Sequence, residues 1–345
     1  MKRGSIHALA RVLIIAHLAC CPVLQAMESA PAPFDTSRAD LQQFAAGMAK
    51  HGFAPGEINT LLSEARAQPR ILEAIQRPAE RTLAWWEYRQ RFLTEERVNG
   101  GVEVWRQNAA DLTRIAAQTG VAPEYLIAIT GVETLYGRIT GRYRVLDALA
   151  TLAFDYPPRA DFFRSELEQF LLMSREEKLD PRQPVGSYAG AMGIPQFMPS
   201  SFRRFAVDGD GDGRRDLWTE GPDVFASVGN YLREHGWVAG QPVLAETWND
   251  APTDDPSRAT LTLAHTLDDL RARGYVFDSP LPGSTKVMLL PAQLSSSLIW
   301  RIGYANFYAI TRYNRSALYG MAVHELARAI ATRHGQAPAQ VASSP

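Results

Sequence analysis

Apolar residues recur at three- and four-residue spacing along most of this 345-residue chain, and this period constrains the fold more than any other feature. The spacing places them on one face of a helix, so it predicts a mainly α protein. We expect helices after Ser37, which can cap the first of them, after Pro55, across 159–178, from 222 to 236 and along 319–330. Because 46% of the residues are hydrophobic, the chain can bury a sizeable core.

Three features lie between the helix that follows Pro55 and residue 123. An aromatic cluster, Trp85–Tyr88, precedes a polar connection that ends at Gly100 and Gly101, and a single helix follows with Trp105 and Ile115 on its apolar face.

Residues 241–292 depart from the helical period and are rich in Pro, Asp and Thr. They contain β-favouring runs at Ala259–Leu263 and Lys286–Leu290 and a short helical pattern near Leu267–Arg273. We therefore predict a small β-containing insertion, after which the helical pattern returns from Leu298.

The N-terminal segment has the features of a secretory signal. Basic residues precede an apolar run, Val12–Cys21, and Ala26 offers a small residue for cleavage. We expect removal of 1–26 and export to the periplasm; the alternative is a lipoprotein acylated at Cys20 or Cys21. Both cysteines of the chain lie here, so the mature protein offers no disulfide or thiolate site. A net charge of −1 gives no electrostatic case for nucleic acid as a partner.

Glu133 is the strongest candidate for chemistry. Pro123 suits the start of its helix and Gly137 suits the end. Apart from Glu133, the helical face on which it lies is apolar, with Leu126, Ile129 and Tyr136. An apolar setting favours the neutral acid and raises the pKa of such a carboxyl, which can then protonate a leaving group near neutral pH. The alternative is a helix glutamate at the edge of the core.

The segment Asp208–Asp216 carries carboxylates at loop positions one, three, five and nine, with Gly213 at position six. This pattern is typical of a loop that wraps oxygen ligands around Ca²⁺. Position twelve is Thr219 instead of a glutamate, so Glu220 or Asp223 would have to close the site. We predict a structural calcium ion here; the alternative is a solvated Asp-Gly turn.

Two further segments could line a binding cleft. Small residues and prolines in Gly186–Ser200 predict a shaped loop in which Ser187 and Gln196 offer neutral hydrogen-bonding groups. The segment Asn306–Ser316, followed by Tyr319, is rich in tyrosine and suits a sugar-binding surface. Each is equally compatible with packing.

Together these segments resemble the lytic murein transglycosylase B family over roughly residues 39–333. The motifs that carry the resemblance are Gly131-Val132-Glu133-Thr134 with Tyr136-Gly137, Ser187 to Gly193 running into Pro195 to Ser200, Asp208 to Trp218, and Asn306-Phe307 with Arg312-Tyr313-Asn314. The chain differs from the family pattern at Pro158 and Phe162, where arginine and tyrosine are usual.

The resemblance implies a lysozyme-like helical core with an additional α domain and a small β-containing insertion. The expected divisions are a signal peptide at 1–26, an N-terminal helical region at 27–100, a catalytic core with an EF-hand-like loop at 101–240, the insertion at 241–297, C-terminal helices completing the core at 298–335 and a disordered tail at 336–345.

The resemblance also implies a peptidoglycan lytic transglycosylase that cleaves the MurNAc-β-1,4-GlcNAc bond without water and without a catalytic cofactor, with Glu133 as the sole acid/base. The implied glycan contacts are Ser187, Gln196, Tyr231, Tyr313 and Tyr319, with Tyr88 and Arg159 more distant. The implied calcium ligands are Asp208, Asp210, Asp212 and Asp223, and the loop pattern adds Asp216. We expect a monomer acting on glycan strands, with other cell-wall enzymes as further partners. A lysozyme-type hydrolase and a non-catalytic cell-wall or calcium-binding protein are the alternatives.

Overall fold

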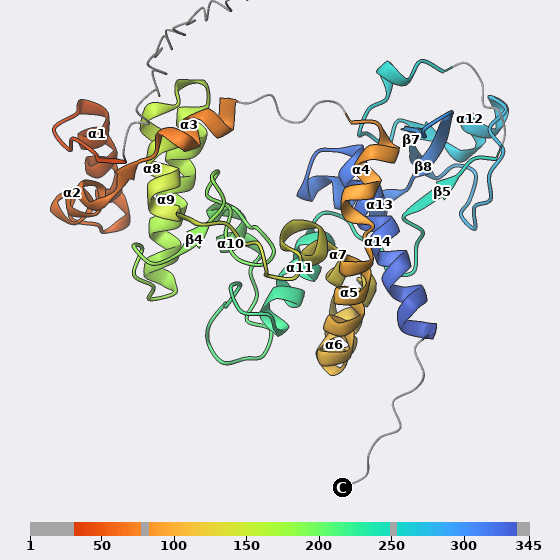
Figure 1. The fold of residues 1–345 in the computed structure, drawn as a ribbon, viewed down its shortest axis with the longest axis horizontal. Coiled ribbons are helices and arrows are strands. Elements are labelled where there is room, and N and C mark those ends of the chain that lie inside the picture. Colours follow the sequence, from red (N-terminus) through yellow and green to blue (C-terminus); the bar gives the residue numbers. More distant parts are fainter. Residues whose placement is uncertain (1–30, 77–82, 249–253, 337–345) are drawn as a thin grey trace, which may run out of the picture. The chain divides into compact units, whose positions relative to one another are not determined.

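The computed structural model describes residues 31–76, 83–248 and 254–336, which are mostly α-helical (Figure 1). The helices in chain order are α1 (Ala39–Gly47), α2 (Pro55–Glu64), α3 (Pro69–Gln76), α4 (Trp85–Phe92), α5 (Glu95–Gln107), α6 (Ala109–Thr119), α7 (Pro123–Thr134), α8 (Val145–Asp155), α9 (Ala160–Glu176), α10 (Pro199–Phe205), α11 (Pro222–Glu234), α12 (Leu267–Ala272), α13 (Ala305–Tyr313) and α14 (Ala317–Gln336). The expected mainly α fold class is confirmed. Within these ranges no helix combines the length and apolar character needed to span a bilayer. The expected signal segment and nearly all of the expected tail lie outside the described residues.

Helix α7 lies in the middle of the helical core, where it contacts both α5 and α14, and these two helices also contact each other (Figure 1). Every residue from Tyr125 to Val132 is buried, because apolar and small side chains cover nearly the whole circumference of this helix. Pro123 begins it, as expected. A second group forms around α8, which packs on α9 and α3. Because α7 is packed on all sides, the backbone of its last turn, which carries Glu133, is held in a fixed position.

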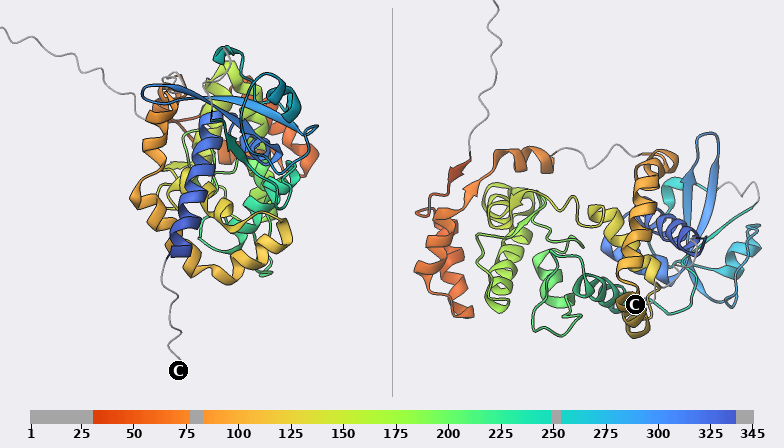
Figure 2. Two further views of the ribbon diagram at one scale, coloured as in Figure 1. Left: turned by 90° about the vertical axis from the view of Figure 1, so that its right-hand side faces the viewer. Right: turned by 60° about the horizontal axis from the view of Figure 1, so that its bottom comes forward.

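The β structure is small. A four-stranded sheet has the order β5-β8-β7-β6, with antiparallel neighbours, and β7 and β8 form its long hairpin (Figure 2). Its strands are β5 (Leu244–Glu246), β6 (His265–Thr266), β7 (Lys286–Gln293) and β8 (Leu298–Gly303). Two short pairs lie among the helices: β1 (Ala32–Pro33) with β2 (Arg66–Ala67), and β3 (Tyr143–Arg144) with β4 (Val185–Gly186).

Two expectations for this region are confirmed and two are wrong. Strand β7 covers the run predicted at 286–290, and α12 covers the predicted short helix. The run at 259–263 is not a strand; it is mostly exposed and joins no sheet. The helical pattern expected from Leu298 is also wrong, because β8 pairs with β7 residue by residue. A short apolar run is ambiguous between helix and strand until its pairing partner is known.

Gly100 and Gly101 lie inside α5 and do not end a polar connection, so that expectation is wrong. A Cβ on Gly100 would lie 2.8 Å from the ring of Tyr136, and one on Gly101 would lie 2.4 Å from Ile330. Close packing of α5 against α7 and α14, and not a turn, therefore explains these glycines.

Helix boundaries differ from expectation in three other places. The aromatic cluster at 85–88 begins a helix of its own, α4. The single helix expected around Trp105 is divided into α5 and α6 at Asn108. Ser37 does not cap α1, because its hydroxyl donates to Asp35 and the N-cap position is Arg38.

Candidate active site

Glu133 lies in the last turn of α7, and the chain leaves this helix through three successive residues with left-handed backbone angles. Leu135, Tyr136 and Gly137 have φ values of 51°, 59° and 85°. Such a run is costly for residues other than glycine and persists only where side chains fix it. Thr134 supplies one such contact: its hydroxyl donates to the carbonyl oxygen of Ile194 at 2.9 Å and accepts from the Gly137 N–H at 3.0 Å. The end of α7 is therefore tied to the loop expected to line the cleft.

Tyr136 supplies the second contact. Its hydroxyl donates to the carbonyl oxygen of Arg97 at 2.6 Å, and the Arg97 guanidinium donates back to the carbonyl oxygen of Gly131 at 3.1 Å. A Cβ on Gly131 would lie only 2.6 Å from the Tyr136 hydroxyl oxygen. The missing side chain at Gly131 therefore leaves room for the Tyr136 hydroxyl, whose hydrogen bond to Arg97 connects the end of α7 to α5. Gly131 and Tyr136 both belong to the motif that carries the family resemblance, but no local pattern reveals this contact, because Tyr136 and Arg97 are 39 residues apart.

The carboxyl group of Glu133 accepts one strong hydrogen bond. The Tyr319 hydroxyl, on α14, donates to Oε1 at 2.6 Å. Burial raises the pKa of Glu133 from 4.5 to about 7, and the bond from Tyr319 acts in the opposite direction. No ion pair with Glu133 is present among the residues that the structure describes. The side chain keeps partial solvent contact, so a ligand can reach it.

Three of the expected tyrosines come together beside Glu133. The rings of Tyr313 and Tyr319 are nearly parallel, with centroids 6.5 Å apart, and Tyr231 packs against Tyr313 at 4.7 Å. The Tyr313 hydroxyl donates to the carbonyl oxygen of Pro195, and the Tyr231 hydroxyl donates to that of Arg312. Because both hydroxyls are engaged with the backbone, these residues offer ring surface and not free polar tips.

The loop between β4 and α10 is held by its own hydrogen bonds. Gln196 has a left-handed backbone, with φ 53°, and its side-chain amide donates to the carbonyl oxygens of Gly193 and Thr140. The Ser187 hydroxyl accepts from the Ala191 N–H at 3.1 Å. Gln196 thus lies against the segment that follows Glu133, and its amide oxygen accepts no hydrogen bond from the described residues.

The two contacts expected to be more distant behave differently. Burial raises the pKa of the Tyr319 phenol, and Tyr88, buried nearby on α4, adds to this shift. Arg159 is exposed at the start of α9, where its guanidinium lies 4.4 Å from the ring centre of Phe162. No described contact joins Arg159 to the group around Glu133.

The aspartate loop brings three carboxylates together. Oxygen atoms of Asp208, Asp210 and Asp212 lie within 4.8 Å of one another, a donor set that suits Ca²⁺. Asp223 is not in this group, because its two oxygens accept from the N–H groups of Gly209 and Asp216, each at 2.7 Å.

Asp216 is also outside the group. Its carboxylate accepts from the N–H groups of Trp218 and Thr219, which form the next turn of the loop. Asp216 and Asp223 therefore shape the loop and fasten it to α11.

The helical core, with Glu133 in the last turn of its central helix, has the architecture of the lysozyme-like lytic transglycosylases. The family model described as "Transglycosylase SLT domain" matches residues 36–328, and the chain belongs to this family. The membrane-bound lytic murein transglycosylase B of Escherichia coli (strain K12) is 41% identical over 300 residues, which cover 84% of this chain and 82% of that protein.

Two solved structures are similar throughout. The soluble lytic transglycosylase SltB1 of Pseudomonas aeruginosa is 45% identical, with a TM-score of 0.81, over 85% of this chain and 99% of that one. The Escherichia coli lytic transglycosylase Slt35 in complex with calcium is 40% identical, with a TM-score of 0.82, over 89% of this chain and 97% of that one.

Proposed function

We propose that this protein is a peptidoglycan lytic transglycosylase that cleaves the MurNAc-β-1,4-GlcNAc bond with Glu133 as its sole acid/base. The observation that carries the proposal is a carboxyl group with a pKa of about 7 that is bonded to Tyr319 and not paired with any described cation. The family and its named relatives support the same reaction class.

The nearest acids downstream of Glu133 in the sequence are engaged elsewhere, which favours a single-carboxylate mechanism. Asp147 accepts from Arg144 and from the Arg66 N–H, and Asp155 pairs with Arg38. A conventional glycosidase needs a second carboxylate as nucleophile or base. The acetamido oxygen and C6 hydroxyl of the substrate can take over these functions.

Glu133 then acts twice. In its protonated form it donates to the glycosidic oxygen, and the C1–O bond breaks while the substrate's acetamido oxygen stabilises the positive charge at C1. The resulting carboxylate accepts the proton of the C6 hydroxyl as that oxygen attacks C1, which forms a 1,6-anhydro ring and consumes no water. The Tyr319 hydroxyl bonds to Oε1 and stabilises the charged form between the two steps.

The side chains around Glu133 suit an uncharged acetamido sugar. We assign glycan contact to the ring surfaces of Tyr231 and Tyr313 and to the polar groups of Ser187 and Gln196. Tyr319 positions the catalytic carboxyl.

The remaining expected contacts are assigned lesser parts. Tyr88 acts through Tyr319, beside which it is buried. Arg159, exposed at the start of α9, is kept as a distant contact.

The loop Asp208–Asp216 is proposed as a structural calcium site. Asp208, Asp210 and Asp212 would hold the ion, and Asp223 would fix the loop beneath it. A related structure contains calcium. The ion would neutralise carboxylates that otherwise repel one another, and it takes no part in the reaction.

Export through residues 1–26 is proposed on the sequence pattern, and a relative named as membrane-bound supports a location at a membrane. Acylation at Cys20 or Cys21 is the specific alternative to cleavage after Ala26. We also propose that the protein is a monomer, that its ligand is the glycan strand of peptidoglycan, and that other cell-wall enzymes are its partners.

The test is digestion of purified murein sacculi followed by mass analysis of the products. The expected fragments end in 1,6-anhydro-MurNAc, which is one water lighter than a hydrolysis product, and the Glu133→Gln variant should release none. Glu124→Gln, in the first turn of the same helix, is the matched control and should remain active. Reducing ends as the main product would establish a lysozyme-type hydrolase instead.

A further inference from the structure

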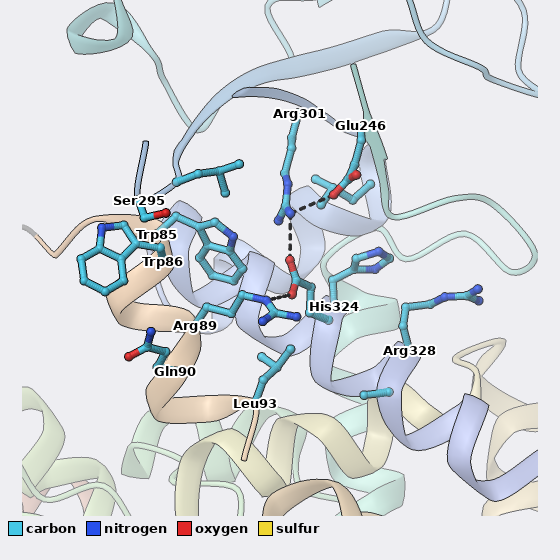
Figure 3. A pocket seen from close by; sticks show the side chains of 14 residues that line it. Trp85, Trp86, Arg89, Gln90, Leu93, Glu246, Ser295, Arg301, His324 and Arg328 are labelled. Carbon is cyan, nitrogen blue, oxygen red and sulfur yellow. Dashed lines mark hydrogen bonds and ion pairs between the residues drawn. The ribbon is translucent and has the colours of Figure 1, made fainter. Parts of the chain in front are cut away.

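A pocket of about 870 Å³ lies between α4, α14 and the sheet and shares no lining residue with the site described above (Figure 3). The two sites use different faces of the same helices. On α4, Tyr88 lies near Tyr319 whereas Arg89 lines the pocket, and on α14 the pocket is lined by Glu325 and Arg328.

Arg301, on β8, is the centre of this pocket. Its side chain is only 5% exposed, and its Nη2 donates to Glu246 at 2.9 Å and to Glu325 at 2.8 Å. Figure 3 shows the Arg301 guanidinium extending from the sheet with Glu246 beside it. The ring centre of Trp85 is 5.1 Å from the guanidinium carbon. Its Nε and Nη1 are buried and have no hydrogen-bond partner among the described residues. A guanidinium carries five N–H groups, and leaving several unused in a buried position is costly.

The pocket has an excess of positive charge. The lining includes three arginines, Arg89, Arg301 and Arg328, and two carboxylates, Glu246 and Glu325. Burial lowers the pKa of the neighbouring His324 to about 4, so the imidazole is neutral at pH 7. Arg328 has no ion pair within the described ranges, and Arg89 shares Glu325 with Arg301.

The two acids are held unequally. Glu325 joins Arg89 and Arg301 and is 18% exposed, so it is a fixed part of the site. Glu246 is 64% exposed, and an exposed carboxylate loses little when it turns into solvent. A carboxylate on a ligand can therefore take the place of Glu246 on Arg301. Trp86, also at the pocket and 37% exposed, offers a ring against the adjoining part of such a ligand.

We propose that this pocket is a second binding site, outside the catalytic cleft, for peptide carboxylates. Arg301 and Arg89 bind the carboxylate, Glu246 moves aside, and Arg328 adds a long-range attraction. The inference rests on the proposed function, since murein carries short acidic peptides on its glycan strands. A strand held here by its peptide stays close to the cleft without occupying it.

The test uses the Glu133→Gln protein, which should bind substrate without cutting it. The murein stem tetrapeptide, free of sugar, is titrated in by calorimetry, beside the same peptide with its carboxylates amidated. We expect saturable binding of the first only. Arg89→Ala plus Arg328→Ala should weaken it at least about tenfold, because the charge-assisted bond from Arg89 and the long-range attraction of Arg328 are both lost. The control, Arg106→Ala plus Arg114→Ala, removes the same charge from exposed positions on α5 and α6 and should leave the affinity within about twofold.

A disaccharide carrying the tetrapeptide separates the two sources of the carboxylate. Binding that is equally sensitive to the pocket variant assigns the site to peptides attached to glycan, and exclusion of the disaccharide form assigns it to free peptides. Three results would each overturn the proposal: no saturable binding, equal affinity in the pocket and control variants, or competition by chitotriose. Competition by chitotriose would place the peptide in the catalytic cleft. Digestion of sacculi by the wild-type protein tests the proposed transglycosylase function separately. The function and the peptide site can therefore each be refuted without the other.

Discussion

The Glu133→Gln substitution should make the protein more stable, and increasingly so as the pH rises. Burial raises the folded-state pKa of Glu133 from 4.5 to about 7. Between these values the unfolded chain has lost the proton and the folded protein has kept it, so folding is progressively penalised as the pH rises through this window. A shift of about 2.5 units corresponds to about 3 kcal/mol, fully present only above pH 7. Glutamine has nearly the same shape and still accepts from Tyr319, but it has no proton to lose.

The measurement is the free energy of unfolding, from urea titrations of both proteins between pH 4 and pH 8. The advantage of the variant should be near zero at pH 4 and reach about 2–3 kcal/mol at pH 8, which is a large fraction of a typical protein's stability. Glu124→Gln should show no such trend. A difference that stays constant across the range would show that the surroundings of Glu133 do not hold its carboxyl group neutral, so that it could not serve as an acid at neutral pH.

Three further experiments test the Tyr319 hydroxyl, the packing at Gly131 and the aspartate loop. Tyr319→Phe removes a bond to a charged acceptor worth about 1.5–3 kcal/mol, so the alkaline limb of the kcat/KM profile on sacculi should move up by about one to two pH units; an unmoved limb would remove the phenol from the mechanism. Gly131→Ala, which sets a methyl group against the Tyr136 hydroxyl, should destabilise the protein by about 1–3 kcal/mol in urea titrations, and a stability gain of the size usual for Gly to Ala in a helix would show that the ring moves freely. Millimolar Ca²⁺ should raise the melting temperature relative to chelator, and Asp210→Ala plus Asp212→Ala should abolish this shift; a shift that survives would place the ion elsewhere.

The helices were predictable because their pattern is local. The apolar stripes give α2, α9, α11 and α14 within a few residues, since a 3.6-residue period needs no information from elsewhere in the chain. The predictions were wrong where contacts with residues distant in the sequence determine the local structure. Strand β8 depends on pairing with β7, and the glycine pair inside α5 is explained by Tyr136 and Ile330, which come later in the chain.

The candidate site divides in the same way. The apolar residues around Glu133 suggest a raised pKa, in agreement with the structure. The expected end of the helix at Gly137 is wrong: α7 ends at Thr134, and Tyr136 lies beyond it with a left-handed backbone instead of on the helical face. The hydroxyl that bonds to it belongs to Tyr319, 186 residues further on, and no local pattern links the two. The resemblance to a family, and not periodicity, brought that tyrosine into the predicted site.

The balance between burial and Tyr319 explains how one carboxyl group can serve both halves of the proposed reaction. A carboxyl left at pKa 4.5 would be protonated in about one molecule in three hundred at pH 7, which is a penalty of about 3 kcal/mol on the first proton transfer. If burial acted alone, the neutral acid would dominate and the carboxylate would be too unfavourable to accept the C6 hydroxyl proton. The bond from Tyr319 lowers the pKa back toward neutrality. At a pKa of about 7 the two forms are nearly equal in free energy, so neither proton transfer carries a large penalty. The stability lost by burying Glu133 is thus the same free energy that makes it an acid at neutral pH, and removing it by Glu133→Gln must stabilise the fold and end the reaction together.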